Sequence, residues 1–179
     1  MLDFSDPVIA AVRTEAEFHA AVRSAVGAVF MLKADLMTLP GLMRDKHGKK
    51  IYVHIDMADG IGKDRRGVEF VAKSGADGII STKNHMIVMA KEAGLGTVQR
   101  FFIIDSGSVV SALDSVRQSK PEYAELMPGV IPKAIKSFVE KAGIPIIAGG
   151  LIESEQDVRT ALGAGAEGVS TGCRALWNL

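Results

Sequence analysis

Two groups of small residues each follow an apolar run, at points where a helix is about to begin. Gly149 and Gly150 follow IPIIA, and Ser170, Thr171 and Gly172 follow AEGV. Glycine lets the backbone come close to a ligand, and free backbone N–H groups near a helix start attract anions. In (β/α)₈ barrels the loops after the seventh and eighth strands often form a phosphate site. The five residues therefore predict a phosphate cradle, although tight turns alone would also use glycine here.

Other polar residues stand where predicted strands end. A ring of cations at this end of a parallel sheet would suit an anionic ligand. His54 and Asp56 are two residues apart, which places them on one side of a strand, from where they could hydrogen-bond ligand hydroxyls. A buried His–Asp pair can equally be structural. The predicted rim consists of Arg13, His54, Asp56, Lys83 and Arg100.

No motif identifies a catalytic centre. His54 and Asp56 could serve as acid and base, but no third partner of clear type accompanies them. The four histidines show no metal-ligand spacing, so no metal is expected. Cys173 stands at a predicted helix start, where its pKa could fall, but the sequence places no base beside it. We therefore assign no catalytic residue.

Two basic runs are candidates for contacts with RNA. RDKHGKK spans 44–50 and KDRR spans 63–66, and clustered lysine and arginine suit phosphate backbones. Charge runs are more often solvated surface, and the chain lacks the signatures of the common RNA-binding modules. The candidate RNA contacts are Arg44, Lys46, Lys49, Lys50, Lys63, Arg65 and Arg66.

Short β-rich runs alternate with helix-periodic runs along the whole chain and position these residues. Strands are predicted at 7–12, 28–34, 50–57, 76–82, 96–102, 122–128, 144–150 and 166–171, each followed by a helix. Thr14 and Glu17 form a predicted capping box, and Ser154 a predicted N-cap. Eight strand–helix pairs with nearly continuous apolar strands predict a compact α/β fold, a TIM-barrel-like (β/α)₈ parallel barrel. An open doubly wound sheet is the alternative.

Length and composition narrow the class of protein. The chain has 179 residues, a formal net charge of zero and 47% hydrophobic residues, typical of one globular domain over 1–179. A net charge of zero gives no general argument for nucleic-acid binding. Cys173 is the single cysteine, so no disulfide is expected, and a reducing cytoplasm fits. No run has the length of a membrane span, and no cofactor motif is present.

Several motifs in order resemble one known family. VHIDMADGIGKD at 53–64, DGIISTK at 77–83, TVQRFFIIDS at 97–106, ELMPGVIPK at 125–133, IPIIAGGLI and STGCRALW resemble the glycerol-3-phosphate-responsive antiterminators of bacterial glycerol uptake operons. The resemblance covers nearly the whole chain and implies a cytoplasmic regulator that senses glycerol 3-phosphate. It also implies binding to the leader mRNA of a glycerol metabolism operon, which prevents transcription termination. The family often has Ser-Asn where this chain has Gly172-Cys173.

Three functions remain open from the sequence. The first is the ligand-gated antiterminator, with leader mRNA and a small phosphorylated ligand as partners and a possible homo-oligomer. The second is a barrel enzyme acting on a small phosphorylated substrate, such as a triose or glycerol phosphate, with His54 or Asp56 as acid or base. The third is a metabolite-binding protein that contacts another protein instead of RNA.

Overall fold

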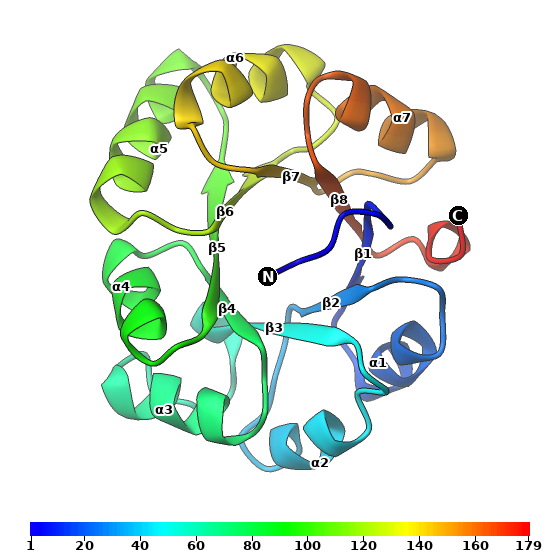
Figure 1. Cartoon of the computed structure of the whole chain (residues 1–179), viewed down its shortest axis with the longest axis vertical. Coiled ribbons are helices and arrows are strands. Elements are labelled where there is room, and N and C mark those ends of the chain that lie inside the picture. Colours follow the sequence, from blue (N-terminus) through cyan, green and yellow to red (C-terminus); the bar gives the residue numbers. More distant parts are fainter.

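The computed structural model describes residues 1–179 and contains a closed barrel of eight parallel strands with sequential neighbours. The prediction of a (β/α)₈ barrel is confirmed, and the open sheet is excluded because β1 pairs with β8. Figure 1 shows the helices as an outer ring around the strands. No helix combines the length and apolar character that crossing a bilayer would require.

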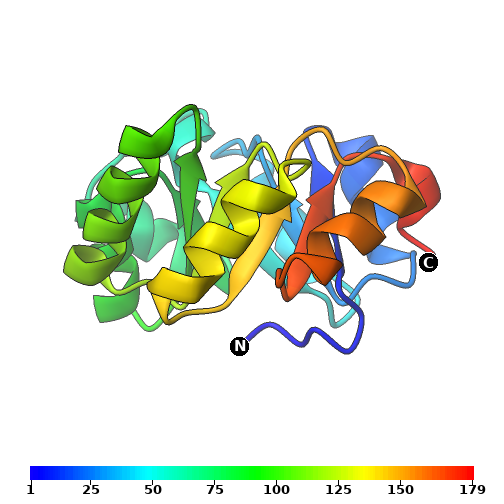
Figure 2. The ribbon, with the colours of Figure 1, turned by 90° about the horizontal axis from the view of Figure 1, so that it is seen from above.

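The elements alternate without interruption. The strands are β1 Val8–Val12, β2 Ala28–Met31, β3 Lys50–His54, β4 Gly78–Ser81, β5 Gly96–Phe102, β6 Tyr123–Met127, β7 Ile146–Gly149 and β8 Gly168–Thr171. The α-helices are α1 Glu15–Val22, α2 Leu39–Arg44, α3 Arg65–Lys73, α4 Asn84–Glu92, α5 Ser106–Ser119, α6 Pro132–Ala142 and α7 Glu155–Gly163. Two 3₁₀ turns, η1 Ile55–Met57 and η2 Arg174–Leu176, complete the chain. The carboxyl ends of the strands share one end of the barrel (Figure 2), and the N-terminal segment lies at the other.

Two predicted elements differ from the structure near the candidate site. The strand predicted at 50–57 ends at His54, and Asp56 lies in the 3₁₀ turn η1. The helix predicted to follow the strand at 166–171 is the single 3₁₀ turn η2. The indole Nε1 of Trp177 donates to the carbonyl of Thr171 over 3.0 Å, which folds the chain back on β8 after one turn.

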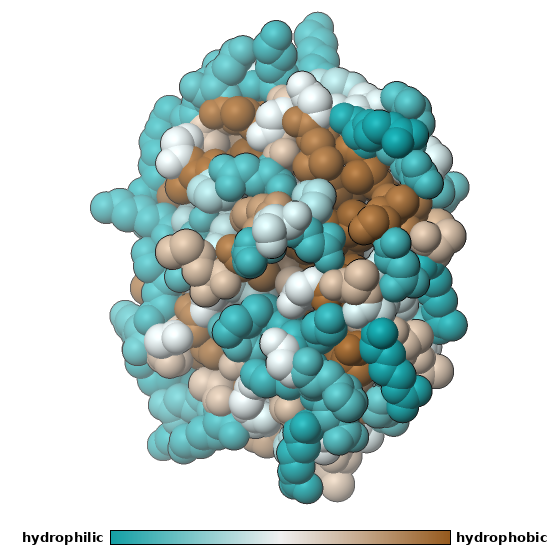
Figure 3. Space-filling view, turned by 45° about the vertical axis from the view of Figure 1, so that its right-hand side comes forward, coloured by the Kyte–Doolittle hydropathy of each residue, from teal (hydrophilic) through white to brown (hydrophobic).

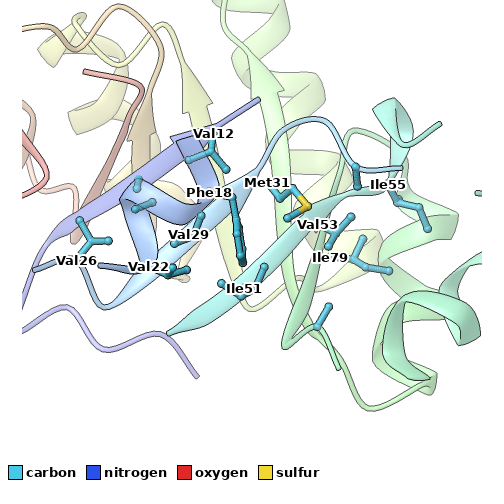
Figure 4. Close-up of a cluster of buried hydrophobic side chains, with 14 of the residues drawn as sticks. Val12, Phe18, Val22, Val26, Val29, Met31, Ile51, Val53, Ile55 and Ile79 are labelled. Carbon is cyan, nitrogen blue, oxygen red and sulfur yellow. The ribbon is translucent and has the colours of Figure 1, made fainter. Parts of the chain in front are cut away.

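The largest apolar core lies between the barrel wall and the helices. Phe18 of α1 is fully buried against strand side chains such as Val29 and Ile51, as Figure 4 shows. The helices turn their apolar faces toward the barrel, and Figure 3 shows hydrophilic residues over much of the visible face with hydrophobic residues reaching the surface between them.

A second core fills the barrel itself and requires two glycines. The ring of Tyr52 is buried inside the barrel. A Cβ on Gly78 would lie 2.3 Å from Tyr52 Cε1, and a Cβ on Gly96 would lie 2.5 Å from the Tyr52 hydroxyl. Strands β4 and β5 therefore begin with glycine because the tyrosine ring occupies the space of their side chains.

The predicted capping box at the start of α1 is present, as is the predicted N-cap at Ser154. Glu17 N–H donates to Thr14 Oγ1 over 3.2 Å, and Thr14 N–H donates to the Glu17 carboxylate. Thr14→Ala should lower the free energy of unfolding by about 1 kcal/mol, measured by urea denaturation. Thr38 begins α2 without a side-chain cap bond, so Thr38→Ala is the matched control and should change little. Equal losses in both variants would contradict the cap's contribution.

Candidate functional site

A cavity of about 620 Å³ opens at the carboxyl end of the barrel, mainly between β5, β6, β7, β8 and β1. It is large enough for a small metabolite. Its lining combines the predicted cradle with residues of other strands: Ala11, Arg13, Leu32, Arg100, Glu125, Met127, Gly150, Leu151, Ile152, Glu153, Ser170, Thr171, Gly172 and Cys173.

The two predicted cradle loops meet in this cavity and are tied together. The Thr171 hydroxyl donates to the carbonyl of Ile152 over 2.7 Å and accepts from Cys173 N–H over 3.0 Å. The Thr171 side chain thus fixes the loop after β7 to the end of β8. Its hydroxyl is not free for a ligand, which differs from the predicted direct contact.

The backbone supplies the free donors of the cradle. The N–H groups of Gly150, Leu151 and Gly172 make no hydrogen bond within the chain. Gly150 and Leu151 have φ of +78° and +62°, a left-handed conformation that is uncommon for leucine. Successive amides in such turns form concave anion sites. The cavity therefore carries unpaired N–H groups at the place where the sequence predicts a phosphate.

A buried ion pair lies beside the cradle. Arg100 Nε donates to Glu125 Oε2 over 2.6 Å, and the Ser170 hydroxyl donates to Glu125 Oε1 over 2.6 Å. Glu125 is fully buried, and Arg100 is 8% exposed. Gly149 makes room for this network, because its Cβ would lie 2.6 Å from both Glu125 Oε1 and Ser170 Oγ. Gly149 therefore supports the network and does not line the cavity itself.

Arg13 is the cation that remains available at the cavity. Its side chain is exposed and forms no ion pair, and its Nη1 lies 3.9 Å from the position of a Gly172 Cβ. The charge of Arg100 is offset by Glu125, although Nε is the only guanidinium nitrogen of Arg100 that bonds within the chain. Glu153 adds a carboxylate at the cavity. The cavity lining therefore combines the unpaired side chain of Arg13 and free backbone amides with the Arg100–Glu125 pair.

The other predicted rim residues do not line the cavity. His54 is 5% exposed, and neither ring nitrogen has a hydrogen-bond partner. Burial, together with the nearby charge of Arg100, lowers the pKa of His54 to about 4. No hydrogen bond joins His54 to Asp56, so the two do not form the acid–base pair considered from the sequence. Lys83 is exposed at the N-cap of α4.

Asp56 fastens the loop after β4. Its carboxylate accepts from the Ser81 hydroxyl over 2.7 Å and from both the N–H and the hydroxyl of Thr82. Burial raises the pKa of Asp56, but these hydrogen bonds outweigh burial and bring the pKa below its usual value. The Asp56 carboxylate is therefore already bonded to Ser81 and Thr82 and is not free to bind a ligand hydroxyl.

The basic runs are largely engaged in contacts within the protein. Lys46 and Lys50 both contact the carboxylate of Asp77, at 2.9 and 3.0 Å. Arg65 pairs with Glu92 and Arg66 with Glu69. Lys49 and Lys63 donate to backbone carbonyls, and Arg44 is exposed in the last turn of α2. Most of these cations already have partners.

Sequence reasoning did not single out Glu125, Met127, Leu151 or Glu153. A signal was present for Glu125, because a carboxylate in the middle of an apolar strand needs a buried partner. No three His, Cys, Asp or Glu side chains gather closely enough to hold a metal ion.

Comparisons with known proteins agree on one family. The family model described as glycerol-3-phosphate responsive antiterminator matches residues 8–177. A glycerol uptake operon antiterminator regulatory protein from Listeria monocytogenes is similar in structure, with a TM-score of 0.91 and 30% identity, covering 96% of this chain and 95% of that one. An antiterminator-related protein from Thermotoga maritima gives a TM-score of 0.84 and 32% identity, covering 95% and 96%.

A curated relative of Escherichia coli, the uncharacterized protein YgcP, is 34% identical over 177 residues, covering 97% of this chain and 93% of that protein. Among solved structures under 25% identical, an aldolase with 12% identity and a TM-score of 0.80 shares the fold.

Proposed function

Because the chain belongs to the glycerol-3-phosphate responsive antiterminator family, we propose that it binds glycerol 3-phosphate and acts on the leader mRNA of a glycerol metabolism operon. In this proposal, the ligand-bound protein prevents transcription termination in the cytoplasm. The assignment of this ligand is supported by the cavity, in which the side chain of Arg13 and the backbone N–H groups of Gly150, Leu151 and Gly172 are all unpaired.

The phosphate of the ligand is proposed to lie against the two loops after β7 and β8. There it would receive N–H donors from the backbone and a charge-assisted bond from Arg13. The glycerol hydroxyls would extend toward Arg100, whose Nη groups have no partner within the chain. Ser170 and Glu125 would act indirectly, by holding Arg100 at the cavity.

Ligand-induced thermal stabilisation tests this site. Glycerol 3-phosphate at 100 times its Kd should stabilise the protein by about 2.7 kcal/mol, which raises Tm by roughly 5–10 °C. Glycerol should give no shift, because it lacks the anion. The absence of a shift at any accessible concentration of glycerol 3-phosphate would overturn the ligand assignment.

Arg13→Gln should weaken glycerol 3-phosphate binding by about 10- to 100-fold, since a hydrogen bond to a charged group contributes roughly 1.5–3 kcal/mol. Isothermal titration calorimetry measures the change directly. Arg23→Gln is the matched control, because Arg23 is also exposed and has no ion pair but lies outside the cavity. Unchanged affinity in Arg13→Gln would place the phosphate elsewhere.

The enzymatic alternative has one favourable observation, which is the carboxylate of Glu125 in a cavity of a fold that aldolases share. Against it, both carboxylate oxygens of Glu125 are hydrogen-bonded, and no lysine that could form a Schiff base lines the cavity. His54 and Asp56 do not line it either. Turnover of triose or glycerol phosphates that is lost in Glu125→Gln would favour the enzyme.

A further inference from the structure

The loop between β6 and α6 connects the cavity to a neighbouring part of the surface. Gly129 N–H donates to the carbonyls of both Gly149 and Gly150, at 2.6 and 3.1 Å. A Cβ on Gly129 would lie 2.8 Å from Gly149 N, so the two loops are in direct backbone contact. Met127, where β6 ends and this loop begins, lines the cavity. Any movement of the cradle loop on ligand binding therefore reaches the β6–α6 loop directly.

Exposed apolar side chains flank this loop. Phe102 is 56% exposed, Ile104 87% and Ile131 41%. Phe102 is paired with Met127 in the sheet, and Ile103 N–H donates to the carbonyl of Met127 over 2.8 Å. Phe102 is the only aromatic residue among the exposed large hydrophobic side chains of the protein. The pairing of Phe102 with Met127 brings the segments that carry Phe102, Ile104 and Ile131 to the same end of β5 and β6, and apolar side chains exposed together often mark a contact site.

The start of α6, which follows the β6–α6 loop, carries unpaired positive charge. Lys133 and Lys136 are exposed in the first turns of α6, directly after Ile131, and neither forms an ion pair or a hydrogen bond within the chain. Glu140 follows Lys136 by four residues in α6, and Asp105 caps α5. We call Phe102, Ile104, Ile131, Lys133 and Lys136 the β5–β6 patch.

We propose that the β5–β6 patch is the surface that contacts single-stranded RNA. A stackable aromatic ring next to unpaired cations is complementary to exposed bases on a phosphate backbone. The cations of the runs at 44–50 and 63–66 are mostly bonded within the protein, whereas Lys133 and Lys136 are free. The proposal rests on the proposed RNA-binding function and adds its location. The hydrogen bonds of Gly129 also connect the proposed ligand site to the proposed RNA-binding surface.

Crosslinking locates the contact. The probe is a random-sequence single-stranded RNA about 30 nucleotides long that contains 4-thiouridine, a length that exceeds the site sizes typical of single-strand binding. It is irradiated with the full-length protein with and without saturating glycerol 3-phosphate. Mass spectrometry should place the crosslinks within 101–105 and 129–137, with a higher yield when the ligand is present. Crosslinks confined to 44–50 or 63–66 would overturn the proposal.

Variants measure the contribution of each part by fluorescence anisotropy with the same RNA. Phe102→Ala should weaken binding about 10-fold through lost base stacking. Lys133→Gln with Lys136→Gln should reduce the slope of log K against log salt by about 1.4, because two phosphate contacts are lost. The matched controls are Val88→Ala and Lys73→Gln, an exposed valine and an exposed unpaired lysine elsewhere on the barrel, and both should bind like the parent.

The outcomes separate this proposal from the proposed function. If both patch variants bind RNA with the affinity of the parent, the assignment of the RNA contact to the β5–β6 patch is wrong. A thermal shift by glycerol 3-phosphate without any RNA binding overturns the RNA surface and leaves the ligand site standing. Sedimentation showing a dimer that Phe102→Ala dissociates, again without RNA binding, would overturn the RNA contact and assign the patch to a second copy of the chain.

Discussion

Arg100→Met should lower the free energy of unfolding by about 3–5 kcal/mol, because it leaves the carboxylate of Glu125 buried without its cation. Glu125 is fully buried, and its pair with Arg100 spans 2.6 Å. The hydroxyl of Ser170 would then be its one remaining partner. Urea denaturation at neutral pH measures the loss.

Two control variants test whether the loss of stability comes from the unpaired buried charge. Arg117→Met removes an exposed ion pair with Asp114 and should cost less than about 1 kcal/mol. Arg100→Met combined with Glu125→Leu removes both charges and should recover most of the stability. A single Arg100→Met variant as stable as the parent would mean that water or a rearranged side chain can replace the guanidinium.

Acid should destabilise the protein through His54 well before its carboxylates are protonated. Burial lowers the pKa of His54 from its ordinary value of 6.5 to about 4. Between these values the unfolded chain binds a proton that the folded chain does not, so stability falls as pH falls. From about pH 7 to about pH 4.5 the loss from this group is roughly 2–3 kcal/mol.

The measurement compares urea denaturation at neutral pH and near pH ~4.5 for the parent and for His54→Gln. The variant should lack this part of the pH dependence, whatever its stability at neutral pH. Asp77, whose pKa is lowered, loses its stabilising contribution at more acidic pH and contributes equally in both proteins. An identical pH dependence in parent and variant would show that His54 is solvated in solution.

The architecture was predictable because its signals are local. Alternating apolar runs, the Thr14–Glu17 capping box and the Ser154 cap depend on residues close together in the chain, and all three predictions are confirmed. Element ends were less accurate: the strand predicted to reach residue 57 turns into η1 after His54. Periodicity does not distinguish the last residues of a strand from a following turn.

The side-chain partners at the candidate site were not predictable from periodicity. The pair of Arg100 with Glu125 joins β5 to β6, and Asp56 bonds to residues at the end of β4. Such contacts depend on the register between strands, which one sequence does not specify. We expected residues that follow parallel strands to meet at one end of the barrel, and Arg13, Gly150 and Gly172 do line one cavity. That expectation requires only that the strands be parallel. It could not reveal which hydroxyls would already be bonded.

Tyr52 and the two glycines beneath its ring limit how this barrel can change by evolution or in the laboratory. Neither Gly78 nor Gly96 can gain a methyl group while the phenol stays in place, because each position meets the ring at 2.3–2.5 Å. A library randomised at these three positions should yield alanine at 96 mainly together with a smaller residue at 52, whereas position 78 should stay glycine because its Cβ would also lie 2.7 Å from the carbonyl oxygen of Gly96. Positions 52 and 96 would then covary in side-chain volume, and single substitutions at 96 would be rare.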